Sequence, residues 1–275
     1  MNPSASSRTG TGPLVFITGA SSGIGQALAR RFVATGHRVA LVARRLDEMQ
    51  AWAAHQGWSE QIARCYGADV TDTDAMLDAA RRCEAEQGLP DIVIANAGIS
   101  LGVDTAHRED VDVFDRVMRT NMHGTVATFH PFIAAMCQRG SGQLVGIASV
   151  AAVRGLPGHG AYCASKAAVV AYCESLRGEC RPHGVRVSTL LPGYVATPLT
   201  ASNRYSMPFL MTADDFAARA VDAIRAGRRY CVIPWPMAIV ARVLRWLPPV
   251  LLDRLLQGRE RKHRANDTSG TASGG

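Results

Sequence analysis

The sequence predicts an α/β protein in which one doubly wound parallel sheet of about seven strands forms a single domain. Two observations lead to this prediction. Short apolar runs alternate with segments of helical periodicity, which is typical of a parallel sheet covered by helices on both faces. The first run, Leu14 to Thr18, is followed by a glycine-rich loop and a helical stretch from Gln26 to Ala34. A chain of 275 residues can bury one substantial core.

The strands are predicted from short apolar runs, and the segments between them are predicted to be helices. In such sheets, ligands bind beyond the carboxyl ends of the strands, where the strand order reverses. The predicted strands are Leu14 to Thr18, Arg38 to Ala43, Ile62 to Tyr66, Ile92 to Ala95, Leu144 to Ala148, Val185 to Leu190 and Tyr230 to Ile233.

Residues 194 to 212 interrupt the alternation with Pro198, Pro208 and a group of apolar side chains. This segment is predicted to form a loop and a short helix over the ligand site, inside a domain that spans residues 13 to 233. The apolar group either contacts an apolar substrate or fills the core beneath a lid. Its members are Met207, Phe209, Leu210 and Met211.

Composition places the chain among globular proteins of a reducing compartment. Hydrophobic residues make up 47% of it and charged residues 19%. The polar ends, residues 1 to 12 and 265 to 275, are predicted to be disordered tails. Seven cysteines without a Cys-x-x-Cys pair argue against a disulfide framework, and no secretory signal is apparent, so a cytoplasmic location is expected. The eight histidines show no ligand spacing, and no metal is predicted.

The net charge of +7 is concentrated near the C-terminus and not in a groove through the domain. Nucleic-acid binding is therefore not expected. Five basic residues stand there against two acidic ones: Arg254, Arg259, Arg261, Lys262 and Arg264 against Asp253 and Glu260.

Residues 234 to 264 form an apolar and basic extension. Arg242 and Arg245 interrupt its apolar run, and neither half reaches the ~20 apolar residues that a bilayer crossing needs. A helix rich in Trp, Leu and Val beside a basic tail can lie flat in an anionic interface, so residues 235 to 264 are predicted to touch the inner face of a membrane. The alternatives are packing over the substrate pocket or against another subunit.

The loop from Thr18 to Gly25 has the composition of a nucleotide cradle. Its glycines let the backbone approach a pyrophosphate, and the following helix start presents free amide groups and a positive dipole end. The alternative is a glycine-rich turn that binds nothing. The loop residues predicted to bind a cofactor are Gly19, Ser21, Ser22, Gly23, Ile24 and Gly25.

Tyr162 and Lys166 lie four residues apart, a spacing that puts a phenol and an ammonium group on one face of a helix. A nearby cation favours the phenolate and is expected to lower the pKa of Tyr162 from about 10. The chain has only two lysines among thirty basic residues, and this scarcity favours a specific role for the lysine at this position. Alone, the pair is a weak signal, because solvated helices carry it by chance.

The motifs together resemble one family, the short-chain dehydrogenases/reductases, over about residues 13 to 200. The resemblance implies a single-domain Rossmann-type oxidoreductase with a nicotinamide cofactor, which assembles as a homodimer or homotetramer through the helices near Asn121 and Tyr162. The matching positions, in family order, are the Thr18 to Gly25 loop, Asp69, Asn96-Ala97-Gly98, Asn121, Ser149, Tyr162, Lys166 and Pro192-Gly193.

The resemblance also implies four catalytic residues. Tyr162 is expected to exchange a proton with the carbonyl or alcohol oxygen while Ser149 holds that oxygen by a hydrogen bond. Lys166 is expected to bond the nicotinamide ribose, and Asn121 to hold a water in a proton relay to Lys166. Ser149 as an ordinary turn serine and Asn121 as a helix residue bonded to the backbone are the alternatives.

Cofactor choice is predicted from Arg44 and Arg45, which follow the second strand where the family places an acidic residue. Guanidinium groups pair well with a 2′-phosphate, so NADP(H) is preferred over NAD(H), unless both arginines are merely solvated. Asp69 is expected at the adenine, Asn96 and Gly98 along the adenine ribose, and Thr197, which resembles a family threonine, at the nicotinamide carboxamide. Further cofactor contacts are expected from Val70, Ala97, Tyr162, Lys166, Pro192, Gly193 and Val195.

The sequence thus predicts an NADP(H)-dependent enzyme that interconverts a carbonyl and a secondary alcohol on a small, lipophilic substrate. One alternative is an NAD-linked alcohol dehydrogenase. Another is a nucleotide sensor or scaffold that has kept the fold and lost the chemistry, although such a binder would not need a tuned phenol.

Overall fold

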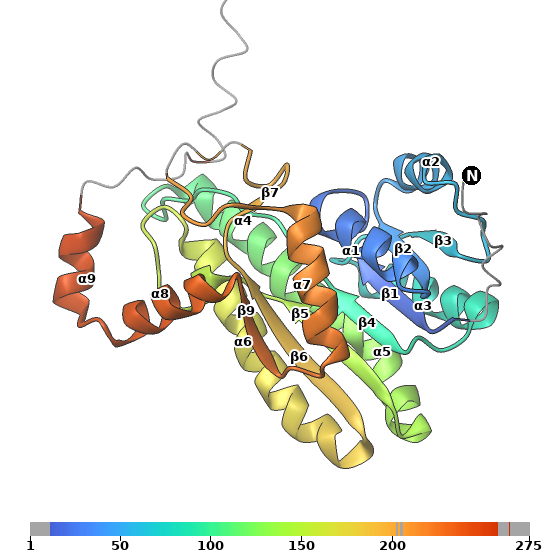
Figure 1. Cartoon of the computed structure of the whole chain (residues 1–275). Helices are drawn as coiled ribbons and strands as arrows, with labels where there is room; N and C mark the ends of the chain where they lie inside the picture. The colour runs from blue at the N-terminus through green and yellow to red at the C-terminus, as the bar shows by residue number, and fades with distance from the viewer. Residues whose placement is uncertain (1–11, 202, 204–205, 258–263, 265–275) are drawn as a thin grey trace, which may run out of the picture.

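The computed structural model describes residues 12–201, 203, 206–257 and 264, and shows one α/β domain built on a seven-stranded parallel sheet (Figure 1). The strand order is β3-β2-β1-β4-β5-β6-β9, which confirms the predicted doubly wound fold. The order reverses between β1 and β4, so their carboxyl ends diverge into a crevice. The strands are β1 (Leu14–Thr18), β2 (Arg38–Ala43), β3 (Ala63–Gly67), β4 (Ile92–Ala95), β5 (Gly142–Ile147), β6 (Val185–Pro192) and β9 (Tyr230–Ile233).

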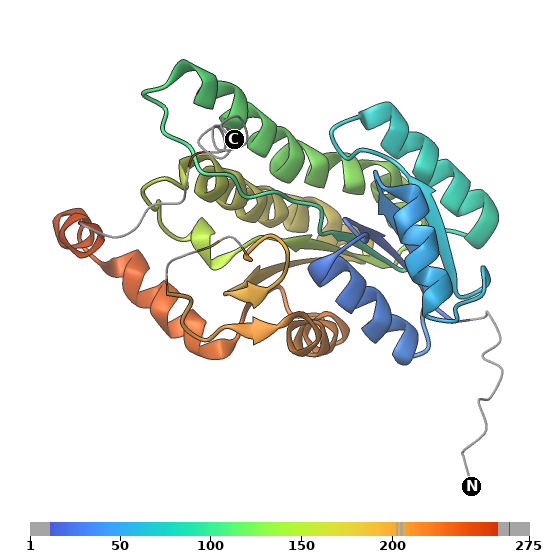
Figure 2. The ribbon, with the colours of Figure 1, turned by 90° about the horizontal axis from the view of Figure 1, so that it is seen from above.

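Helices cover both faces of the sheet, as Figure 2 shows from above. One face carries α1 (Gly23–Ala34), α2 (Leu46–His55) and α7 (Ala213–Arg225). The other carries α3 (Thr73–Gln87), α5 (Gly124–Arg139) and α6 (Gly160–Cys180), with α4 (Arg108–Met118) packed against α6. After β9, the chain continues into α8 (Trp235–Trp246) and α9 (Pro249–Leu256).

The two faces bury separate cores because successive residues of a strand point to opposite sides. In β1, Val15 and Ile17 pack with α1 and α7, whereas Leu14 and Phe16 pack with α3, α5 and α6. Phe16 meets Phe132 of α5 edge to face, with ring centroids 4.8 Å apart. This continuous apolar strand, buried on both sides, is typical of a parallel sheet.

Several predicted boundaries differ from the structure. The third strand runs over Ala63–Gly67 and not from Ile62 to Tyr66, and the fifth begins at Gly142 because that residue pairs with Val185 of β6. The sixth strand continues to Pro192, which pairs with Ile233 of β9. These boundaries depend on neighbouring strands, so apolar runs alone do not reveal them.

The helix after the glycine loop begins at Gly23, three residues earlier than predicted. The loop's last glycines therefore belong to the first helical turn. The backbone is crowded there, since a Cβ on Gly25 would come within 2.9 Å of the Ala20 Cα and of the Asn96 side-chain nitrogen. Glycine has a low helix propensity, but it is the only residue without a Cβ and therefore the only one that fits where the backbone passes this close to its neighbours.

The short helix predicted within residues 194 to 212 is wrong for the described part of that segment. The chain instead forms β7 (Val195–Ala196) and β8 (Met211–Thr212), a two-stranded parallel sheet, with a single helical turn in which the Ala201 amide donates to the Thr197 carbonyl. Phe209 and Leu210 are exposed, so they do not fill the core. The two ends of the segment are extended because Val195–Ala196 pairs with Met211–Thr212, so the backbone groups of these residues bond across the two strands and not along a helix.

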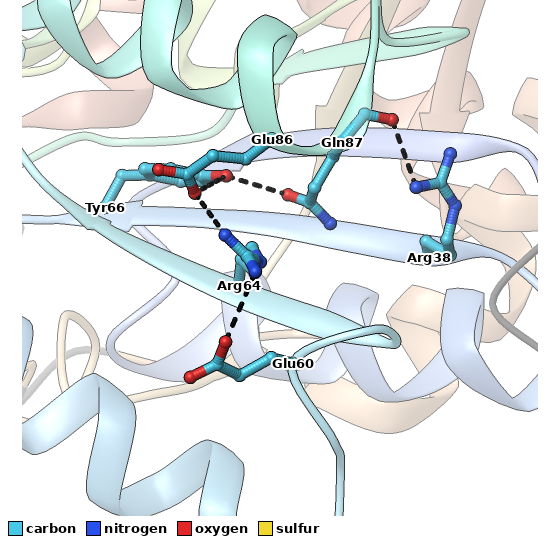
Figure 3. A network of polar contacts seen from close by, with 6 residues as sticks. All are labelled: Arg38, Glu60, Arg64, Tyr66, Glu86 and Gln87. Atoms are coloured by element: carbon cyan, nitrogen blue, oxygen red, sulfur yellow. Dashed lines mark hydrogen bonds and ion pairs between the residues drawn. The ribbon is translucent and has the colours of Figure 1, made fainter.

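A polar network covers the edge of the sheet at β3 (Figure 3). Arg64 donates to Glu86 of α3 at 2.6 Å and to Glu60 at 3.3 Å, and the Tyr66 hydroxyl donates to Glu86 at 3.1 Å. Arg38 donates to the carbonyl of Gln87 at 3.0 Å. These contacts connect β2 and β3 to α3 and place charged groups along an edge that would otherwise offer free backbone groups for pairing.

The C-terminal extension returns to the body of the molecule. Arg264 forms ion pairs with Asp110 at 2.8 Å and Glu109 at 2.7 Å, and its backbone bridges Gly102. Among the described residues, no single helix is long and apolar enough to cross a membrane. α8 and α9 together reach that length and apolar composition, but the chain bends by 120° between them. The predicted disorder of residues 1 to 11 and 265 to 275 concerns positions outside the described residues.

Candidate active site

The carboxyl ends of the strands surround a pocket of about 370 Å³. It extends from the ends of β2 and β3 to the ends of β5 and β6, across the point where the strand order reverses. Its lining is Gly19, Ser21, Ser22, Gly23, Ile24, Ala43, Arg44, Arg45, Ala68, Asp69, Val70, Asn96, Ala97, Gly98, Ile99, Thr120, Ile147, Ala148, Ser149, Tyr162, Lys166, Pro192, Gly193, Val195, Thr197, Pro198, Leu199 and Thr200.

The glycine loop brings bare backbone to the pocket. Gly19 and Gly23 have φ values of 67° and 54°, a region that side chains with a Cβ rarely occupy. The side-chain nitrogen of Asn96, at the end of β4, donates to the Thr18 carbonyl at 3.0 Å and to the Gly19 carbonyl at 3.2 Å. These two bonds fix the loop to the end of β4. The loop ends in the free amides of the α1 N-terminus, so the site fits a pyrophosphate.

We expect Gly19→Ala to destroy nucleotide binding and to lower stability. The new methyl would lie 2.7 Å from the Ala97 Cα, and φ would remain in the left-handed region, a strain of about 1–3 kcal/mol. Titration with NADPH, followed by fluorescence, and thermal unfolding would measure the two effects. Gly57→Ala is the matched control, because its φ of 70° is similar but open space surrounds it. An NADPH affinity equal to that of the control would contradict this account.

Tyr162 and Lys166 occupy consecutive turns at the start of α6, as their spacing predicts. The Lys166 ammonium lies 5.9 Å from the centroid of the Tyr162 ring and donates to the Ile147 carbonyl at 2.8 Å. Lys166 is buried, while Tyr162 is half-buried at the pocket surface. Ser149, two residues after the end of β5, shares a side-chain hydrogen bond with Tyr162. Three of the four predicted catalytic residues therefore converge.

The expected lowering of the Tyr162 pKa is wrong for this structure. Burial raises the pKa of Tyr162, and the hydrogen bond with Ser149 only partly opposes this effect. Burial also lowers the pKa of Lys166 to about 8. Both shifts favour the neutral forms, because a charged group loses hydration in the protein interior. The ammonium points beneath the ring to a carbonyl and not at the phenol oxygen, which the spacing alone does not reveal.

Asn121 lies behind the lining, in a short π-helix (Arg119–His123) between α4 and α5. Its side-chain oxygen accepts from the Ile99 amide at 2.8 Å, and its nitrogen donates to the Ile99 carbonyl and the Ser165 hydroxyl, each at 2.9 Å. A Cβ on Gly98 would come within 3.2 Å of the Asn121 oxygen and 3.3 Å of the Lys166 nitrogen. π-Bulges are frequent at functional sites, but the predicted relay through Asn121 stays a prediction.

Two guanidinium groups lie at the opposite end of the pocket. Arg44 is 3.6 Å from Asp69, and Arg45 is 2.9 Å from Glu48 and donates to the Ser21 hydroxyl at 3.4 Å. Both arginines are exposed, and such ion pairs contribute little to stability. They can therefore be exchanged for contacts with a bound anion at small cost. The Asp69 carboxylate also accepts from the amide and hydroxyl of Thr71, which fixes its position.

The structure gathers the predicted cofactor residues around this pocket, except Gly25, which lies behind its surface. Their roles remain predictions. Several lining residues were not predicted individually from the sequence. Pro198, Leu199 and Thr200 lie in the segment predicted over the site, and the others stand next to or near the predicted motif residues. The full set is Ala43, Ala68, Ile99, Thr120, Ile147, Ala148, Pro198, Leu199 and Thr200. Within the described part of the chain, no three His, Cys, Asp or Glu side chains cluster as metal ligands would.

Comparison with known proteins identifies the family. The family model for short chain dehydrogenases matches residues 13–207. An uncharacterized oxidoreductase of Myxococcus xanthus is 39% identical over 86% of this chain and 93% of its own length, and a dehydrogenase/reductase SDR family member 7B of Bos taurus is 34% identical over 93% and 84%. The structure of a putative short-chain dehydrogenase from Novosphingobium aromaticivorans aligns with a TM-score of 0.75 at 25% identity, covering 94% of this chain and 92% of that one. This chain is therefore an oxidoreductase that belongs to the short-chain dehydrogenase/reductase family, whose members use NAD(H) or NADP(H).

Proposed function

We propose that this protein is an NADP(H)-dependent oxidoreductase that interconverts a carbonyl and a secondary alcohol on a lipophilic substrate. The observation that carries the proposal is one pocket with two different ends. Ser149, Tyr162 and Lys166 stand at one end, and Arg44 and Arg45 at the other. The first set suits proton exchange with a reacting oxygen, and the second suits a phosphate.

The residues of this chain supply positioning and a proton. When bound, the nicotinamide supplies a hydride to the carbonyl carbon. The Tyr162 hydroxyl donates its proton to the carbonyl oxygen, whose negative charge grows as the bond to carbon forms, and Ser149 donates a hydrogen bond that holds this oxygen. In the oxidative direction, Tyr162 accepts the proton of the alcohol. A phenol with its ordinary pKa of about 10 is protonated at neutral pH, as the reductive direction requires, and burial raises the pKa of Tyr162 further.

The preference for NADP(H) or NAD(H) is inferred from the residues at the end of β2, which decide whether a 2′-phosphate can bind there. Position 43 is alanine, so no carboxylate at the strand end is offered to a ribose 2′-hydroxyl, and two arginines follow. A 2′-phosphate placed there would take over the contacts that Arg44 and Arg45 now make with acidic neighbours. We therefore favour NADP(H) over NAD(H).

The lipophilic substrate is inferred from the surroundings of Ser149 and Tyr162. Ile99, Val195, Pro198 and Leu199 contribute apolar side chains to the pocket lining, next to the hydroxyl groups of Thr197 and Thr200. We place the protein in the cytoplasm as a homo-oligomer, in keeping with its seven free cysteines and its family. Contact with a membrane surface is argued in the next section.

The proposal is tested by following NADPH oxidation with a panel of ketones of increasing chain length. We expect turnover with NADPH that exceeds turnover with NADH, and kcat/KM that increases with apolar chain length. Tight NADPH binding without turnover on any carbonyl would instead identify a nucleotide sensor. Preference for NADH would overturn the cofactor assignment.

We expect kcat/KM for NADPH to fall as pH rises through about 8. Burial lowers the pKa of Lys166 to about 8, so the free protein loses this ammonium above that pH and with it a donor to the ribose. Since kcat/KM reports the ionisation of free enzyme, steady-state rates between pH 6 and about 10 should reveal the group. NADPH affinity measured over the same range should weaken in parallel. A profile that stays flat across pH 8 would contradict this role.

A further inference from the structure

The outer surfaces of α8 and α9 expose large apolar side chains on helices that extend away from the sheet (Figure 1). Those of α8 recur at steps of four, four and three residues, which places them on one side of the helix. Trp235 is 68% exposed and Trp246 is 81% exposed, unusual values for so large an apolar group. We call the following set the C-terminal apolar face: Trp235, Ile239, Val243, Trp246, Val250, Leu251 and Leu255.

The opposite side of α8 is fixed to the substrate end of the pocket. Met237 and Ala241 are buried, and Met237 packs so closely on Gly193 that a Cβ there would lie 3.0 Å from the methionine side chain. At the other end of the helix, Arg154 donates a hydrogen bond to the Leu247 carbonyl. Because Gly193 lines the pocket and Arg154 follows Ser149 by five residues, α8 spans the outside of the reaction site. The C-terminal apolar face is thus held in a defined orientation.

The charge of this region complements an anionic surface. Residues 234 to 264 contain seven basic and two acidic side chains. Arg264 is ion-paired with Glu109 and Asp110, so the other six basic side chains carry the positive charge of this region. The exposed charges of α8 are Arg242 and Arg245, and α8 has no acidic residue. A second copy of the chain docked face to face would bring these like charges together, which disfavours self-association through this surface.

We infer that the C-terminal apolar face docks on a phospholipid bilayer that contains anionic lipid. Both helices are short and the pair bends by 120°, so they suit insertion along the interface and not across the bilayer. Tryptophan favours this depth, and arginine beside it can reach the headgroups. The inference rests on the proposed function for its purpose, because docking would bring the substrate end of the pocket to the source of a lipophilic carbonyl compound.

The test uses the full-length protein and sedimentation with vesicles of phosphatidylcholine, with or without about one-third phosphatidylglycerol. We expect wild-type protein to sediment with the anionic vesicles and to be released by high salt. Val243→Glu/Trp246→Glu should weaken binding by roughly tenfold or more, because it replaces inserted apolar groups by charges that anionic lipid repels. Val111→Glu is the matched control, since Val111 is an exposed apolar residue of α4 outside the face, and it should bind as the wild type does.

Three results would overturn the inference. The first is no sedimentation with anionic vesicles, the second is equal sedimentation with neutral vesicles, and the third is equal binding by the double variant. A double variant with a lower mass in analytical ultracentrifugation, together with no vesicle binding by wild type, would assign the face to a second copy. Reduction of a water-soluble ketone by wild type and the double variant is measured in parallel. Activity without vesicle binding rejects only the docking, and vesicle binding without activity rejects only the proposed function.

Discussion

Tyr162→Phe is expected to lower kcat for carbonyl reduction by roughly 10²–10⁴-fold, the usual contribution of a positioned general acid. The substitution removes one oxygen and leaves the ring where Lys166 lies 5.9 Å from its centroid. NADPH affinity should therefore change little. Steady-state rates and an NADPH titration of the same preparation separate the two effects.

Tyr172→Phe is the matched control for this experiment. Tyr172 lies on the same helix, ten residues further along, where it stacks on Phe129 with ring centroids 6.4 Å apart and does not line the pocket. Loss of its hydroxyl should leave kcat unchanged. If Tyr162→Phe kept the wild-type kcat, proton transfer would have to come from another group, and the proposed chemistry would fail.

Arg44→Asp/Arg45→Ser is expected to weaken NADPH binding by roughly 10²–10³-fold. A hydrogen bond to a charged group contributes about 1.5–3 kcal/mol, and exposure of both arginines reduces that value. Tenfold in affinity corresponds to about 1.4 kcal/mol. NADH has no 2′-phosphate, so its affinity should be kept or improved by the new carboxylate. Equilibrium titration with each nucleotide measures the change in preference.

The control for this change of charge is Arg81→Asp, since Arg81 is exposed on α3 and does not line the pocket. It should leave the affinity for NADPH within error of wild type. Folding should survive in the double variant, because the lost ion pairs, Arg44 with Asp69 and Arg45 with Glu48, lie at the surface. Equal loss of NADPH and NADH affinity would show that the arginines do not recognise the 2′-phosphate.

Features that depend only on residues close together in the sequence could be predicted from the sequence. The shared face of Tyr162 and Lys166 needs only the helical repeat, and the turn at Gly19 needs only a residue that tolerates positive φ. β1, β2, β4 and β9 occur at the predicted residues because each consists mainly of apolar side chains, and β1 and β4 are buried along their whole length. These signals determined the fold class and located the site at the carboxyl edge of the sheet.

Only the tertiary structure decided where each functional group points and what covers it. Lys166 is bonded to the carbonyl of Ile147, nineteen residues away, so burial and not attraction to the phenol dominates both pKa values. Contacts between Arg154 and Leu247, and between Arg264 and Asp110, join segments separated by 93 and 154 residues. No local pattern encodes such pairs. They arise when the whole sheet forms, because packing and desolvation depend on every segment that meets at a given place.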